Sequence, residues 1–224
     1  MTAAVEALRQ RFAVYGRFYE ADIDGRTLEL RSHLEIFERD VAWPQAADAR
    51  ADLVAVMMNP GGSRPLAEAD RRGWTPAQPD RTQYQLMKLA LRAQEAGHAI
   101  RHIRVINLSD LRTPKSAELF AALASLADDR HSMFSPQRAA ELRKALGRGR
   151  GSPLLRAWGL ARQLEPLAAK AVAATRHCEV LGLTDNGLGY RHPLPQRADF
   201  QQRWLDDMGM QFAAACAGRL DGAG

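Results

Sequence analysis

Four short apolar runs, each ended by a polar loop, constrain the fold of this chain most strongly. They occupy residues 53–58, 103–108, 154–158 and 179–183, and for the third of them a helix is the alternative to a strand. Between them, other stretches carry apolar side chains at helical spacing. Because parallel strands must be joined by a crossover, usually a helix, this alternation predicts an α/β fold. We expect a three-layer sandwich with a mostly parallel central sheet of roughly four strands.

Residues 18–23 and 27–36 predict an N-terminal β-hairpin that precedes this alternation. Leu28, Leu30, Leu34 and Ile36 fall on alternate positions, and Asp24-Gly25 supplies a turn that tolerates positive φ. Residues 63–80 are rich in Pro, Gly, Asp and Arg, which indicates a long functional loop. A final amphipathic helix is expected near residues 200–217.

Length and composition favour one globular domain over residues 1–224. Its parts are a hairpin and connection over 15–50, a core over 51–196 and a C-terminal helix over 197–224. The chain is 46% hydrophobic and 25% charged, which is ordinary for a globular protein. Its apolar runs are far shorter than the roughly 20 residues that cross a bilayer, so no membrane partner is expected.

Only two cysteines, Cys178 and Cys216, are present, too few and too far apart for a disulfide framework or a zinc cluster. A reducing, cytoplasmic location is therefore expected. His98 and His102 lie four residues apart, but Gly97 argues against a helical metal site. No metal is expected.

The formal charge of +5 and the pI of about 9.6 permit an acidic partner such as nucleic acid. If the positive charge is spread evenly, it serves only solubility. The sequence has no Walker P-loop, dinucleotide fingerprint, Gly-x-Ser-x-Gly elbow or His-Glu-x-x-His pair. The enzyme classes that depend on those motifs are thereby disfavoured.

Polar residues follow the apolar runs. After the first comes Asn59-Pro60-Gly61, where an Asn amide can orient water or substrate and Gly permits close backbone approach. The same residues are also common turn formers. Asn107 interrupts the second run, and a buried Asn either braces a neighbouring loop or hydrogen-bonds to a ligand.

His192 lies between Arg191 and Pro193 in the loop after the last run. It could donate a hydrogen bond to negative charge developing on a leaving group, whereas a lone loop histidine is more often solvated. Trp74, in the long loop, could stack on a base or pack against the rim of the core.

Taken in order, these motifs resemble the uracil-DNA glycosylase superfamily. The matching strings are Met57-Met58-Asn59-Pro60-Gly61, Val105-Ile106-Asn107, Ala157-Trp158-Gly159 and His192-Pro193-Leu194-Pro195. With Gly182-Leu183-Thr184 and Arg191-His192-Pro193-Leu194, they also resemble an uncharacterised bacterial family of unknown function, over roughly residues 15 to 196. That second resemblance implies no activity.

The glycosylase resemblance implies that a nucleotide flips into a pocket, with DNA or a nucleoside or nucleotide as partner. It implies that Asn107 reads the base, that His192 stabilises the departing base and that Asn59 positions the attacking water. It also implies a substrate-binding surface made by Pro60, Gly61, Trp74, Arg191 and Pro193. No metal or organic cofactor is implied.

Two departures from the glycosylase motifs support a second hypothesis. Met57 stands where that family has Gly, and Leu194 stands where it has Ser. The chain could therefore be a non-catalytic module that binds nucleic acid or a nucleotide on the same fold. A third hypothesis is a hydrolase or binder of an unrelated small metabolite.

Overall fold

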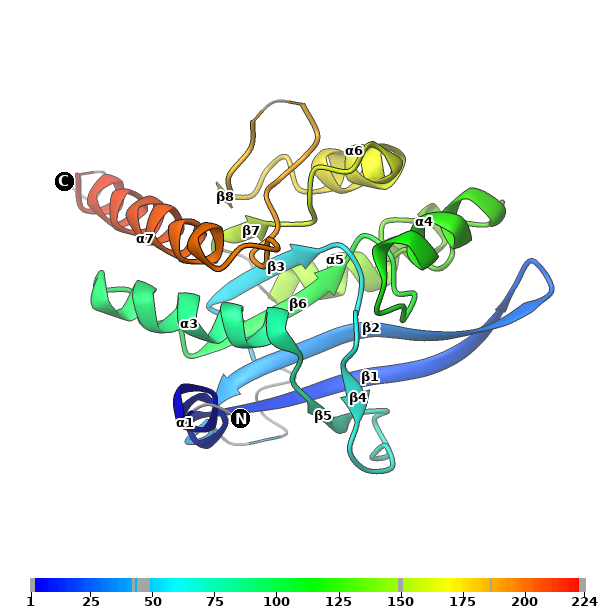
Figure 1. The fold of residues 1–224 in the computed structure, drawn as a ribbon, viewed down its shortest axis with the longest axis horizontal. Helices are drawn as coiled ribbons and strands as arrows, with labels where there is room; N and C mark the ends of the chain where they lie inside the picture. Colours follow the sequence, from blue (N-terminus) through cyan, green and yellow to red (C-terminus); the bar gives the residue numbers. More distant parts are fainter. Residues whose placement is uncertain (1–2, 42, 44–48, 149–150, 186, 222–224) are drawn as a thin grey trace.

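In the computed structural model, which describes residues 3–41, 43, 49–148, 151–185 and 187–221, eight strands form one mixed sheet (Figure 1). Their order across the sheet is β4–β5–β1–β2–β6–β3–β7–β8. The strands are β1 (Phe12–Ile23), β2 (Arg26–Glu38), β3 (Leu53–Met57), β4 (Arg64–Pro65), β5 (Thr75–Gln78), β6 (His102–Asn107), β7 (Leu154–Arg156) and β8 (Val180–Leu181).

The four expected strands are β3, β6, β7 and β8, and they are parallel neighbours in the order β6–β3–β7–β8. The prediction of a mostly parallel sheet of roughly four strands is nevertheless wrong. The hairpin joins the sheet through antiparallel pairing of β2 with β6, and β4 and β5 form within the segment expected to be a loop. Of the seven neighbouring pairs, the four on this side are antiparallel.

Helices cover both faces of the sheet, as expected. One face, here called the α3 face, packs against α1 (Ala3–Arg11), α3 (Arg81–Glu95) and α7 (Ala198–Asp221). The other, here called the α5 face, packs against α4 (Ser116–Ser125), α5 (Ala139–Arg148) and α6 (Glu165–Ala174). None of the helices in the described part of the chain is long and apolar enough to span a bilayer.

The hairpin turn is formed by Asp24 and Gly25, with φ of 51° and 70°, which confirms the predicted turn. The tip extends away from the rest of the sheet toward the end of α4 (Figure 1). There the Asp24 carboxylate accepts hydrogen bonds from the backbone N–H groups of Ala127 at 2.7 Å and Asp128 at 3.1 Å. The turn therefore also anchors the segment that follows α4.

A bulge at Ser32 changes which face the apolar residues of β2 reach. Arg17 pairs with His33 while Phe18 pairs with Arg31, so Ser32 has no partner on β1. Because side chains alternate along a strand, one extra residue reverses the pattern. Leu30 consequently packs on the α5 face, whereas Leu34 and Ile36 pack on the α3 face.

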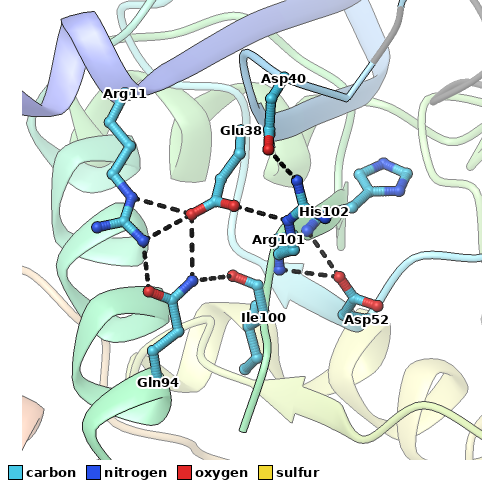
Figure 2. Close-up of polar contacts among 8 residues, drawn as sticks. All are labelled: Arg11, Glu38, Asp40, Asp52, Gln94, Ile100, Arg101 and His102. Carbon is cyan, nitrogen blue, oxygen red and sulfur yellow. Dashed lines mark hydrogen bonds and ion pairs between the residues drawn. The ribbon is translucent and has the colours of Figure 1, made fainter.

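Glu38, at the end of β2, links four elements (Figure 2). Its carboxylate accepts hydrogen bonds from Arg11 of α1 at 2.7 and 2.9 Å, from Gln94 of α3 at 3.2 Å and from Arg101, beside β6, at 2.8 Å. Burial opposes its ionisation, but these hydrogen bonds outweigh that effect and hold the pKa of Glu38 below its usual range.

Candidate functional site

A cavity of about 480 Å³ lies where β3 and β7 run into their following loops. Its wall is built from the residues after these strands, the starts of α3 and α4, and residues 192 and 194–196. Among the candidate residues, Asn59, Gly61 and His192 line it together. The structure thus brings two segments more than 130 positions apart in the sequence to one concave site. We call it the strand-end cavity.

Asn59 uses one half of its amide to brace a loop. Its Nδ2 donates to the carbonyl oxygens of Leu111 at 3.1 Å and Thr113 at 2.9 Å, and lies 3.1 Å from Thr113 Oγ1. No described residue donates a hydrogen bond to its Oδ1. These hydrogen bonds fix the side chain and hold the loop after β6 against the loop after β3.

Gly61 has a φ of +64°, a conformation that side chains disfavour. A Cβ atom here would lie 2.9 Å from Oδ2 of Asp80. Asp80 is the N-cap of α3, where its carboxylate accepts from the backbone N–H of Gln83 at 3.0 Å. The glycine thus allows the loop after β3 to lie against the start of α3. Pro60 is buried and lies outside the cavity lining.

His192 is held in a neutral form with a defined tautomer. Desolvation by burial lowers the pKa of His192 to about 4. Its Nδ1 accepts a hydrogen bond from the backbone N–H of Leu194 at 3.1 Å. Because Nδ1 is the acceptor, the single ring proton of the neutral imidazole is on Nε2. His192 therefore presents a neutral N–H donor.

The Trp158-Gly159 pair after β7 fixes the segment that carries His192. The indole of Trp158 donates to the carbonyl oxygen of Leu188 at 2.9 Å. Gly159 and Tyr190 exchange backbone hydrogen bonds of 2.6 and 3.2 Å, with Gly159 at φ +105°. A residue with a side chain would be strained at this φ, so the glycine suits this close pairing.

Asn107 is the last residue of β6 and is completely buried. Among the residues that the structure describes, neither its Nδ2 nor its Oδ1 has a hydrogen-bond partner. It does not line the strand-end cavity. Alternation with Ile103 and Val105 directs it to the α3 face, beside the cavity rather than within it. A buried amide without partners is costly, which marks this position as one that a ligand or ordered water would stabilise.

Three further candidates lie outside the strand-end cavity. Pro193 is buried, and Arg191 is exposed and forms an ion pair with Asp185. Trp74 lies apart from Asn59 and His192. Its ring centroid lies 5.3 Å from that of Trp43 and 6.1 Å from that of His33, between β5 and the hairpin. Trp74 thus packs at the rim of the core, which was one of the two alternatives for this residue.

A second cavity of about 690 Å³ adjoins the first and shares Gly159, His192, Pro195 and Gln196 with it. Arg191, Arg203 and Phe200 line its outer part. The guanidinium of Arg203 lies 5.9 Å from the Phe200 ring. His192 thus stands between two hollows, one of which carries cationic and aromatic side chains.

Sequence reasoning missed several residues of the strand-end cavity. Phe120 of α4 lines this cavity, but it belongs to an apolar helical stripe, a pattern that predicts packing in the core. Thr82, Thr113 and Ser116 add hydroxyl groups from the start of α3, the loop after β6 and the start of α4. Isolated hydroxyl residues carry no motif, so only the fold identifies them.

The described lining of the strand-end cavity contains amide, hydroxyl, imidazole and aromatic groups and no carboxylate. Within the described residues, no group of three or more His, Cys, Asp or Glu could hold a metal ion. Such a lining suits a neutral polar ligand with a flat apolar face.

No protein-family model, curated protein or solved structure matches the chain.

Proposed function

We propose that this protein hydrolyses the N-glycosidic bond of a base in DNA or in a nucleoside, on a fold related to uracil-DNA glycosylases. One observation carries the proposal. A neutral histidine with its proton on Nε2 lines the same cavity as an asparagine whose Oδ1 accepts no hydrogen bond from a described residue. The histidine, His192, is a hydrogen-bond donor suited to a departing base. The asparagine, Asn59, is an acceptor suited to a water molecule.

Cleavage of this bond transfers its electron pair to the base and leaves positive charge on the sugar. The Nε2–H of His192 donates a hydrogen bond to the oxygen of the departing base, where negative charge develops. The ring stays neutral and does not have to be protonated first. Asn59 Oδ1 accepts from a water molecule and positions it for attack on the sugar carbon. The water proton leaves to solvent, since no carboxylate is among the described lining residues.

Two further features fit a base as ligand. A volume of about 480 Å³ accommodates a nucleoside-sized molecule. Phe120 offers an aromatic face on which a base can stack. Asn107, whose buried amide has no hydrogen-bond partner among the described residues, is the residue proposed to read the base edge.

The test is a panel of oligonucleotides, single- and double-stranded, that carry uracil, hypoxanthine or a mismatch, together with the matching nucleosides. Released base and abasic sites are measured by chromatography and by alkaline strand cleavage. We expect release from at least one member. No release from any of them, alongside an active glycosylase as positive control, would refute the proposal.

A non-catalytic binding module is the second candidate, and the lining favours it at one point. Without a carboxylate, the cavity can position water but cannot deprotonate it. The discriminating measurement is nucleoside binding by calorimetry. Binding that Asn59→Ala and His192→Ala weaken, without base release, supports the module. Absence of both binding and release excludes it as well.

A further inference from the structure

A third cavity, lined mainly by charged and polar side chains, lies on the α5 face between the hairpin and α5. Its volume is about 230 Å³, and its lining is Arg17, His33, Arg72, Trp74, Arg104, Glu141, Lys144 and Ala145. It shares no lining residue with the strand-end cavity. We call it the hairpin cavity, and its argument does not rest on the function proposed above.

Cationic groups dominate the hairpin cavity, with four against one carboxylate. Arg104 is neutralised by Glu35, at 2.8 Å. The carboxylate, Glu141, is already bound by Arg138 at 2.8 Å. Arg17 and Lys144 are exposed and have no ion pair with any residue that the structure describes. The cavity therefore carries a surplus of positive charge.

The cationic side chains are supported by an ordered loop before β5. The Asp70 carboxylate accepts from the backbone N–H groups of Arg72 at 2.8 Å and Trp74 at 2.9 Å. Trp74 is 6% exposed, and the guanidinium of Arg17 lies 5.8 Å from its ring. This turn and this ring position Arg72 and Arg17 in the lining, to which α5 adds Lys144.

We infer that the hairpin cavity binds a phosphate group. The forked N–H groups of arginine match phosphate oxygens, and a lysine ammonium adds a mobile point charge. At 230 Å³ the cavity is smaller than most sites for whole ligands, which bind in about 300–1,000 Å³. It therefore takes the phosphate, while the rest of the ligand lies outside.

An adjoining groove of about 640 Å³ provides that outside space. It shares Arg17 and Glu141 with the hairpin cavity and continues past Phe18, Tyr19 and Arg130. A phosphate ester with an extended organic part fits this pair of hollows. The phosphate could belong to a free nucleotide or to a nucleic-acid backbone, and the experiment distinguishes these sources.

The experiment measures binding of pyrophosphate, a nucleoside diphosphate and a single-stranded oligonucleotide by calorimetry, at about 50 mM ionic strength so that screening stays weak. The double variant Arg17→Gln, Lys144→Gln removes the two cationic side chains of the cavity that form no ion pair with a described residue. The matched control is Lys88→Gln, Arg176→Gln, which has the same change of charge at exposed positions outside the cavity. Circular dichroism verifies that all three proteins are folded.

We expect the cavity variant to weaken binding by at least about tenfold, and the control variant by less than about twofold. Loss of pyrophosphate and diphosphate binding assigns a free phosphate ligand. Loss confined to the oligonucleotide assigns a backbone phosphate. No saturable binding of any of the three, or equal weakening in the two variants, overturns the inference.

Discussion

His192 determines how the candidate site depends on pH. An unperturbed histidine would titrate near pH 6.5, whereas burial lowers the pKa of His192 to about 4. The Nε2–H donor of a neutral ring is therefore present throughout the range from about pH 5 to 8. Catalysis or binding that uses this donor is expected to be independent of His192 titration near neutral pH.

The same lowered pKa predicts a loss of stability in acid. As the pH falls from about 6.5 to 4, the unfolded chain gains a proton at His192 and the folded chain does not, which costs up to about 3 kcal/mol. Urea unfolding of the wild type and His192→Gln, at several pH values, measures this. The wild type should lose more stability than the variant over that interval.

Asp110 makes the comparison with the variant necessary. Burial raises the pKa of Asp110 to about 6, so its protonation stabilises the folded protein over the same interval, in the opposite direction. Both proteins contain Asp110, so the difference between them isolates His192. Parallel stability profiles for the two proteins would contradict the lowered pKa of His192.

Single residues also show how far the sequence could lead. Asn59, Gly61 and His192 were identifiable because polar residues after parallel strands meet at one edge of the sheet. The packing of Trp74 beside the hairpin could not be predicted, because its position depends on β5 pairing with β1, a long-range contact that no local pattern encodes. Phe120 was missed because an aromatic residue in a helical stripe looks the same at a core or at a cavity.

Glu38 gives a prediction at the scale of elements, since it joins α1, β2, α3 and the start of β6 (Figure 2). Glu38→Ala should lower the free energy of unfolding by about 2 kcal/mol, because a largely buried carboxylate and its hydrogen bonds to Gln94 and to two half-exposed arginines are lost. Glu68→Ala, at an exposed loop position, is the control and should change it by less than about 0.5 kcal/mol.

The effect of Glu38 should also depend on pH with a defined sign. Since the pKa of Glu38 is lowered in the folded protein, its stabilisation is full above the ordinary value of about 4.3 and is lost as the pH falls through the folded value. The difference between wild type and Glu38→Ala should therefore shrink below about pH 4. A difference that is constant down to pH 3 would contradict the ionised network.

The hairpin turn gives a second prediction at this scale. Asp24 has φ 51° and accepts two backbone hydrogen bonds from the segment after α4. Asp24→Ala should cost about 1–2 kcal/mol, because alanine disfavours this φ and cannot accept those bonds. Asp24→Asn tolerates the φ and retains an acceptor, so it should remain within about 0.5 kcal/mol of wild type. Equal loss in both variants would exclude this role for the turn.

The positions of the elements were largely predictable, but the face of the sheet that each apolar side chain of β2 reaches was not. Periodicity correctly located the hairpin, the four parallel strands and the helices on both faces of the sheet. The spacing of Leu30, Leu34 and Ile36 suggested one common face, but the unpaired Ser32 sends the two later residues to the other face. A bulge is set by pairing between strands, which a single strand's pattern does not reveal.

At the scale of the whole molecule, the strand-end cavity and the hairpin cavity lie at different parts of the sheet. The parallel half ends in the strand-end cavity, with its neutral donor and acceptor. The antiparallel half, added by the hairpin, carries the cationic hairpin cavity. The hairpin thus contributes Arg17 and His33 to a cavity whose other cations come from the loop before β5, from β6 and from α5.

The most direct test of this account is the single-turnover rate of base release, on the best substrate of the panel, by wild type, Asn59→Ala, His192→Ala and His177→Ala. His177 is exposed and lines neither cavity beside His192, so its variant is the matched control. We predict that His192→Ala lowers the rate by about 100- to 1,000-fold and Asn59→Ala by at least about tenfold, with His177→Ala unchanged. Base release that survives both cavity substitutions at the wild-type rate would contradict the assignment of the strand-end cavity as the active site.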